Sequence, residues 1–237
     1  MPSAVLAFAL ATLREALRGP APWLIAALGL SAVAAGLGLG IFALSSDPEA
    51  AGRLALESSM GTAALGTLWV LARTLDGDRR SGFCAAADQA RGGPRARWLG
   101  RYAGALGTGL LAAVPAAGWG VVWAQSSVFS LVIASTSAAA LAGAVALALH
   151  ALRWGGVAVG LGSAALWVLG HLPWGAPGWG GATLGWLAGL LPPGVREGRP
   201  TPACLVATAG WLALALARAR AVGEGEGPEG EATGGAP

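Results

Sequence analysis

The chain contains few side chains of the types that perform covalent chemistry or bind metals. Ser163 precedes His171 by eight positions in one apolar stretch, so a single helix would separate them by about 12 Å at 1.5 Å per residue. A serine nucleophile and its base must meet within about 3 Å. His150 and His171 lie at opposite ends of neighbouring predicted spans, which predicts no metal cluster. The sequence therefore predicts neither a catalytic site nor a metal site.

The remaining candidate residues lie in one charged segment, from Asp76 to Arg101, which reads DGDRRSGFCAAADQARGGPRARWLGR. It opens with an acid-Arg-Arg-x-Gly turn formed by Asp78, Arg79, Arg80 and Gly82. Arginines in such a segment could bind a soluble partner, or they could only set topology and contact anionic headgroups. The chain has no GxxxxGK[ST] loop, so it does not bind ATP by that device.

The composition places this segment in a membrane protein. Of 237 residues, 55% are hydrophobic and 11% are charged, whereas about 25% are charged in an average soluble domain. The mean hydropathy of +0.62 excludes a soluble globule and a disordered chain. The net charge of +3 comes from arginines that stand between long apolar stretches. That pattern favours a membrane over nucleic acid as the partner.

The uncharged stretches predict an all-α integral membrane protein with six transmembrane helices. About 20 residues cross the hydrocarbon core, so the 51 uncharged residues from Tyr102 to Leu152 must form two spans, divided at Gln125. The predicted spans are about 23–44, 58–75, 104–124, 128–151, 154–171 and 201–217. They form one transmembrane domain over residues 1–222, with a large loop at 76–101.

The arginines predict the orientation of these spans. With the N-terminus inside, twelve of the fifteen arginines fall in cytoplasmic segments, and only Arg53, Arg196 and Arg199 fall outside. This distribution obeys the positive-inside rule and places both termini in the cytoplasm.

The segments outside the spans have their own patterns. Apolar residues recur at helical spacing from Val5 to Leu17, before Pro20, and predict an N-terminal helix that lies in the membrane interface. Prolines and glycines interrupt residues 172–200, which are expected to form an outer re-entrant segment. The Gly- and Glu-rich residues 223–237 are expected to be a disordered cytoplasmic tail.

Two motifs in the charged segment resemble those of permease subunits of type-two ABC exporters. In that family a turn similar to Glu-Arg-x-x-Gly-Thr follows the second span, and a Pro-x-x-Arg segment leads into Leu-Gly-[Lys/Arg]. Here residues 78–83 stand for the first motif, and residues 94–97 with 99–101 stand for the second. The chain departs from the family at Asp78, where the family has Glu, and at Phe83, where it has Thr. The interfacial first helix and the outer segment also agree, so the similarity covers nearly the whole chain as an arrangement.

The resemblance implies a permease that carries no cofactor and catalyses no reaction itself. Two permease chains, identical or related, would form the pathway in a bacterial cytoplasmic (inner) membrane. Two ATPase subunits, holding ATP and Mg, would dock on the cytoplasmic side. Segment 76–94 would be the coupling element, with an exposed acid and arginines suited to a polar, reversible interface. The residues expected to couple to the ATPases are Asp76, Asp78, Arg79, Arg80, Gly82, Phe83, Pro94 and Arg95.

Three other functions fit parts of the sequence. The haem-exporter membrane subunit of cytochrome c maturation has a similar length and six spans, and Leu68-Trp69-Val70 before the charged turn fits it partly. An alternative of another class is a non-transporting membrane scaffold that only anchors a soluble complex. An intramembrane enzyme using Ser163 ranks third. The substrate is not predicted, although an uncharged pathway suits an apolar or amphipathic cargo.

Overall fold

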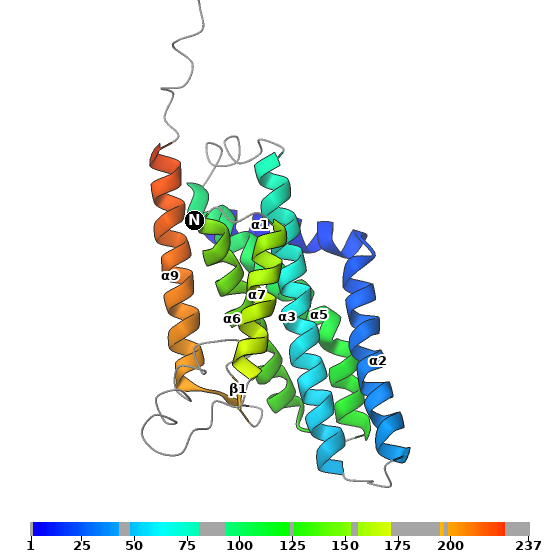
Figure 1. Ribbon diagram of the computed structural model, residues 1–237. Helices are drawn as coiled ribbons and strands as arrows, with labels where there is room; N and C mark the ends of the chain where they lie inside the picture. The colour runs from blue at the N-terminus through cyan, green and yellow to red at the C-terminus, as the bar shows by residue number, and fades with distance from the viewer. Residues whose placement is uncertain are drawn as a thin grey trace, which may run out of the picture.

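Helices account for nearly all of the chain that the computed structural model describes, which is residues 2–42, 48–80, 93–123, 126–152, 156–171, 195–196 and 199–225 (Figure 1). The helices are α1 (Pro2–Arg18), α2 (Ala21–Phe42), α3 (Pro48–Arg80), α5 (Gly93–Trp123), α6 (Val128–Ala151), α7 (Gly156–His171) and α9 (Pro202–Gly225). Two strands, β1 (Val195–Arg196) and β2 (Arg199–Pro200), pair antiparallel. The fold is therefore all-helical apart from this two-residue ladder, which lies within the expected outer segment.

Helices α3 and α5 extend well beyond the apolar spans that the sequence predicts. They contain 33 and 31 residues, whereas the predicted spans cover residues 58–75 and 104–124. Charged side chains lower the local hydropathy, but Arg and Glu are good helix formers and do not end a helix. The expected loop at 76–101 is thereby shortened, because its first five and last nine residues are helical. Helix α9 likewise runs to Gly225, three residues into the expected tail.

Four segments are long and apolar enough to cross a membrane: Ala51–Asp78, Gly93–Val122, Val128–Ala151 and Pro202–Ala219. Helix α1 and the first part of α2 form a pair bent by 69°, which gives a fifth if the pair is counted as one span. Helix α7 has 16 residues, or about 24 Å at 1.5 Å per residue. The described chain thus has the helices of a multi-pass membrane protein, while the number six and the side of each terminus stay predictions.

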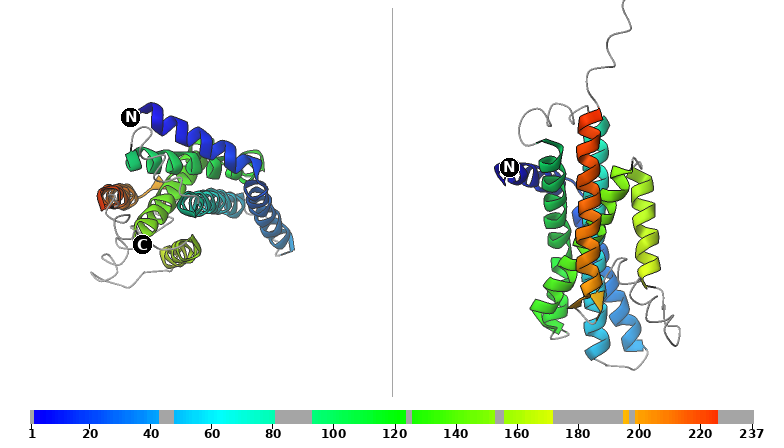
Figure 2. Two further views of the ribbon diagram at one scale, coloured as in Figure 1. Left: turned by 90° about the horizontal axis from the view of Figure 1, so that it is seen from above. Right: turned by 90° about the vertical axis from the view of Figure 1, so that its left-hand side faces the viewer.

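Helix α1 lies across one end of the bundle, and the other helices run roughly along the long axis of the bundle (Figures 1 and 2). We call this the α1 end; the last turn of α3, the first turn of α5 and the last turn of α9 lie there too (Figure 1). Helix α3 packs against α2, α5, α6 and α7, and α9 packs against α6. Helices α3 and α6 therefore lie at the centre of the bundle.

The bundle has an interior of small side chains and an apolar exterior. Ala138, Ala142 and Ala146 of α6 are all buried, and such residues allow helices to approach closely. On the outside, Trp23, Leu28, Val157, Leu161 and Val206 are each more than 60% exposed. An exterior of this kind is suited to lipid or to another apolar helix rather than to water.

Helices α3 and α5 cross at two glycines near the middle of the bundle. A Cβ atom placed on Gly66 would lie 2.8 Å from the Cα atom of Gly109. A Cβ atom on Gly109 would in turn clash with the carbonyl oxygen of Ala63 and the hydroxyl oxygen of Thr67. We call this contact the glycine crossing; any side chain at either position would force the helices apart.

Candidate functional site

The last turns of α3 carry an acidic residue on the face that packs against α5. Thr67, Leu71, Thr74 and Asp78 are all buried, and their spacing of four, three and four residues places them on one side of the helix. Leu65, Trp69 and Arg73 lie on the opposite, exposed face. Asp78 therefore continues the buried stripe of α3 to the α1 end.

Asp78 forms a two-point ion pair with Arg101 of α5. Arg101 Nε donates to Asp78 Oδ2 at 3.0 Å, and Arg101 Nη2 donates to Asp78 Oδ1 at 2.6 Å. The two side chains are only 6% and 8% exposed. Two parallel N–H···O bonds to one carboxylate are the strongest geometry available to an Arg–Asp pair. The pair fixes the end of α3 against the beginning of α5.

The same guanidinium also binds helix α1. Arg101 Nη1 donates to Thr12 Oγ1 at 3.0 Å and lies 3.5 Å from Glu15 Oε2. The Thr12 hydroxyl donates to the carbonyl oxygen of Phe8 at 2.8 Å, so its oxygen is free to accept from the arginine. A single side chain thus joins three helices at the α1 end.

Arg97, one turn before Arg101, brings a second guanidinium to the same carboxylate. Its Nη1 atom lies 3.9 Å from Asp78 Oδ2, and its side chain is 7% exposed. We call Thr12, Glu15, Asp78, Arg97 and Arg101 the Asp78 cluster. Taking a charge out of water costs several kcal/mol unless it is paired, and removing one partner of a buried pair typically costs about 3–5 kcal/mol.

Two glycines of α5 bring α1 close enough to reach this cluster. A Cβ atom on Gly100 would lie 2.7 Å from the carbonyl oxygen of Val5 and would clash with Phe8. A Cβ atom on Gly104 would lie 2.5 Å from the carbonyl oxygen of Ala9. Small residues four positions apart form a flat surface on which another helix can lie. The docking of α1 on α5 therefore depends on both glycines.

The structure separates the predicted coupling residues into two helix ends. Asp76, Asp78, Arg79 and Arg80 lie in the last turns of α3, and Pro94 and Arg95 lie in the first turn of α5. The first turn of α5 starts at Gly93, whose φ of +68° favours glycine, and proline is preorganised for the position after it. Arg95 is exposed. Gly82 and Phe83 lie outside the described residues.

The expectation that Asp78 is exposed is wrong, since the residue is only 5% exposed. The acid-Arg-Arg-x-Gly pattern predicts a turn at residues 78–80. In the structure these residues are helical, because α3 continues to Arg80. Helical phase then turns Asp78 toward α5, where Arg101 neutralises its charge.

The sequence reasoning missed the partners of Asp78. Arg101 belongs to the Leu-Gly-Arg motif, but the motif does not predict that Arg101 binds Asp78. The two motifs that carry the resemblance in fact meet through Asp78 and Arg101. Arg97 and Arg101 are four positions apart, a usable signal that they share one side of a helix, although not that this side is buried. No comparable signal pointed to Thr12, which is 89 positions away from Arg101.

The Asp78 cluster joins helices α1, α3 and α5 through hydrogen bonds and ion pairs. Its carboxylates and guanidiniums face one another, and its hydroxyl is engaged in two hydrogen bonds. Elsewhere, the Ser163 hydroxyl is buried and has no hydrogen-bond partner among the described residues. No family model, no curated protein and no solved structure matches this chain.

Proposed function

We propose that this chain is the membrane-spanning permease subunit of an ATP-binding cassette transporter, an exporter of type two, which works with separate ATPase subunits. The observation that supports this function is the junction at the α1 end. There Arg101 joins α1 to the ends of α3 and α5. Those two helix ends carry the charged segment on which a soluble partner would act.

The proposed mechanism follows from the stiffness of the elements at this junction. A partner that displaces residues 81–92 would pull on two continuous helices of 33 and 31 residues. The Asp78–Arg101 pair would keep the two ends together, and Thr12 would carry the displacement to α1. Farther from the α1 end, the small residues at the glycine crossing would let α3 and α5 slide past one another.

The proposed assembly contains two permease chains and two ATPase subunits that hold ATP and Mg. The α1 end would face the cytoplasm of a bacterial inner membrane, since the arginines concentrate there. The apolar exterior of α7 and α9 leaves surface for a second permease chain as well as for lipid.

Co-purification from membranes of the native host tests this function. The tagged chain should bring down a nucleotide-binding chain, and the complex in lipid should hydrolyse ATP faster than the ATPase alone. A triple variant, Arg79→Ala with Arg80→Ala and Arg95→Ala, should lose at least 90% of the bound ATPase. Asp78 is left unchanged, because its loss would damage the junction itself.

Arg218→Ala is the matched control, since Arg218 is an exposed arginine of α9 outside the charged segment. It should retain the ATPase. A stable complex that contains no nucleotide-binding chain would contradict the proposal and would support the membrane scaffold instead. An ATPase that stays bound to the triple variant would show that the charged segment is not the docking surface.

A further inference from the structure

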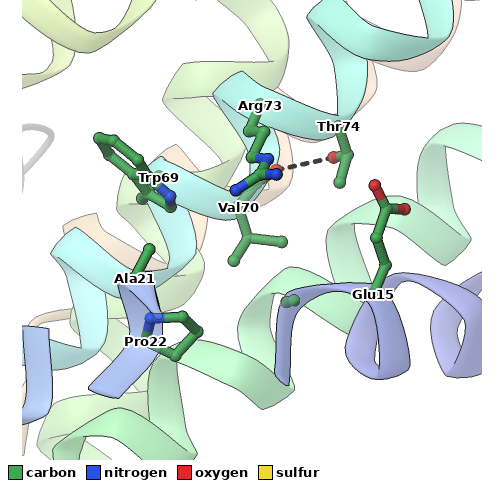
Figure 3. Close-up of a pocket in the computed structure, with 8 residues that line it drawn as sticks. Glu15, Ala21, Pro22, Trp69, Val70, Arg73 and Thr74 are labelled. Carbon is green, nitrogen blue, oxygen red and sulfur yellow. Dashed lines mark hydrogen bonds between the residues drawn. The ribbon is translucent and has the colours of Figure 1, made fainter. Parts of the chain in front are cut away.

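A small pocket lies beside the elbow between α1 and α2 (Figure 3). Its walls come from three helices: Glu15 and Ala16 of α1, Ala21 and Pro22 of α2, and Trp69, Val70, Arg73 and Thr74 of α3. This pocket is distinct from the Asp78 cluster, with which it shares only Glu15. It opens on the exposed face of α3, where Leu65 is 57% and Trp69 is 52% exposed.

The pocket has one positive and one negative group at its edge. Arg73 is exposed, and its Nη1 atom would lie 3.7 Å from a Cβ atom on Gly19, so the guanidinium reaches over the elbow. Among the described residues, no carboxylate lies within ion-pair distance of Arg73. The Glu15 side chain is 57% exposed, and only its Oε2 atom approaches Arg101, at 3.5 Å. Figure 3 shows Arg73 above Val70 and Glu15 to the right of Val70.

The rest of the pocket is lined by apolar side chains and by Thr74, whose hydroxyl already has a hydrogen-bond partner. The Thr74 hydroxyl donates to the carbonyl oxygen of Val70 at 2.7 Å, as the dashed line in Figure 3 shows. The indole of Trp69 lies beside Ala21 and Pro22 at the start of α2 (Figure 3). One turn before Trp69 in α3, Leu65 continues the same exposed face.

The residues around the elbow are of the kinds that favour the boundary between headgroups and acyl chains. Helix α1 turns away from α2 by 69° at the elbow, and its outer face mixes Leu6 and Leu10 with the exposed Arg14. A helix of this kind lies in the plane of the interface. Trp23, just beyond the elbow, is 65% exposed, and tryptophan prefers the same depth.

We propose that this pocket binds a zwitterionic phospholipid with a primary ammonium group, of the phosphatidylethanolamine type. Arg73 binds the phosphate, because a guanidinium matches two phosphate oxygens. Glu15 accepts hydrogen bonds from the ammonium, and one acyl chain lies along Trp69 and Leu65. A headgroup with net negative charge would meet the Glu15 carboxylate, and a choline headgroup has no N–H to donate. This site goes beyond the proposed transport function and does not depend on it.

Native mass spectrometry of the full chain in a mild detergent tests the site. The protein is mixed with phosphatidylethanolamine, phosphatidylcholine or phosphatidylglycerol of identical acyl chains. We expect the first lipid to be retained at least fivefold more than the other two. Arg73→Gln should lower the retention of all three lipids, because they share the phosphate. Glu15→Gln should lower the preference for phosphatidylethanolamine, because a neutral amide oxygen accepts a weaker hydrogen bond from an ammonium than a carboxylate does. Both variants change groups at the protein surface, and Gln at position 15 can still accept from Arg101.

Arg14→Gln is the control, because Arg14 is exposed on α1 but does not line the pocket. It should leave the lipid preference unchanged. Equal or stronger retention of phosphatidylglycerol would overturn the proposal, and so would unchanged retention of phosphatidylethanolamine in Arg73→Gln. A chain that binds no ATPase but keeps the lipid preference would disprove only the proposed transport function.

Discussion

Helices α3 and α5 meet in two chemically different ways along one interface. At the α1 end, Arg101 Nη2 lies 2.6 Å from Asp78 Oδ1, and the contact needs two particular opposite charges. At the glycine crossing, a Cβ atom on Gly66 would lie 2.8 Å from Gly109 Cα, and the contact needs the absence of side chains. The first contact is directional and the second depends on close packing.

This difference follows the polarity expected along a membrane-spanning helix. An unpaired charge at the centre of a bilayer is expensive, whereas near a helix end it can reach the interface. Close packing of small residues needs no charge and works at any depth. Two polar contacts among the described residues are neutral: Tyr102, next to Arg101, donates to the carbonyl oxygen of Ala140 at 2.9 Å, and farther from the α1 end Ser135 donates to Ser59 at 3.2 Å.

Removing one charge from the ion pair should have the largest effect on stability. Arg101→Ala leaves Asp78 buried without its two-point partner, which should cost about 3–5 kcal/mol. The measurement is the thermal unfolding midpoint of purified protein in detergent, together with the yield of monodisperse protein. Arg95→Ala, on the same helix but exposed, should change the free energy of unfolding by less than about 0.5 kcal/mol.

The double variant Asp78→Leu with Arg101→Met then separates charge from packing. It removes the two charges of the two-point pair and keeps apolar volume, but the buried Arg97 loses the Asp78 carboxylate. The double variant should therefore recover part of the lost stability. If the double variant unfolds as readily as Arg101→Ala, the ion pair is not what makes the α1 end sensitive.

A methyl group at the glycine crossing should have an intermediate effect. In Gly109→Ala the new Cβ meets Ala63 and Thr67, and overpacking of this kind costs about 1–3 kcal/mol. Gly118→Ala is the control on the same helix, because a Cβ there meets nothing within 4 Å. Alanine favours helix over glycine, so the control should be neutral or slightly stabilising. Equal losses in both variants would show that the close approach is not required.

Removing a central hydrogen bond should have the smallest effect. Ser135→Ala deletes the 3.2 Å contact with Ser59, but the Ser59 hydroxyl still donates to the carbonyl oxygen of Leu56 at 2.8 Å. Hydrogen bonds between membrane helices average about 0.6 kcal/mol. A loss above about 2 kcal/mol in the same unfolding assay would mean that polar contacts, rather than small residues, hold the centre.

Much of the helical architecture was predictable from apolar runs. The predicted span 128–151 coincides with α6, Val128–Ala151, and the predicted span 154–171 is close to α7, Gly156–His171. Those helices end where the apolar run ends. The ends of α3 and α5 could not be predicted in this way, because their charged turns remain helical.

Composition along the chain is enough to predict that it forms apolar helices and that its charges crowd into one segment. Which of those charges are buried and paired depends on how the helices pack in three dimensions. Asp78 and Arg101 are 23 positions apart, and Thr12 is 89 positions from Arg101. Their meeting depends on helical phase and on the glycines that let α1 approach α5. The hydropathy pattern along the chain shows neither which way Asp78 and Arg101 face nor which helices pack together.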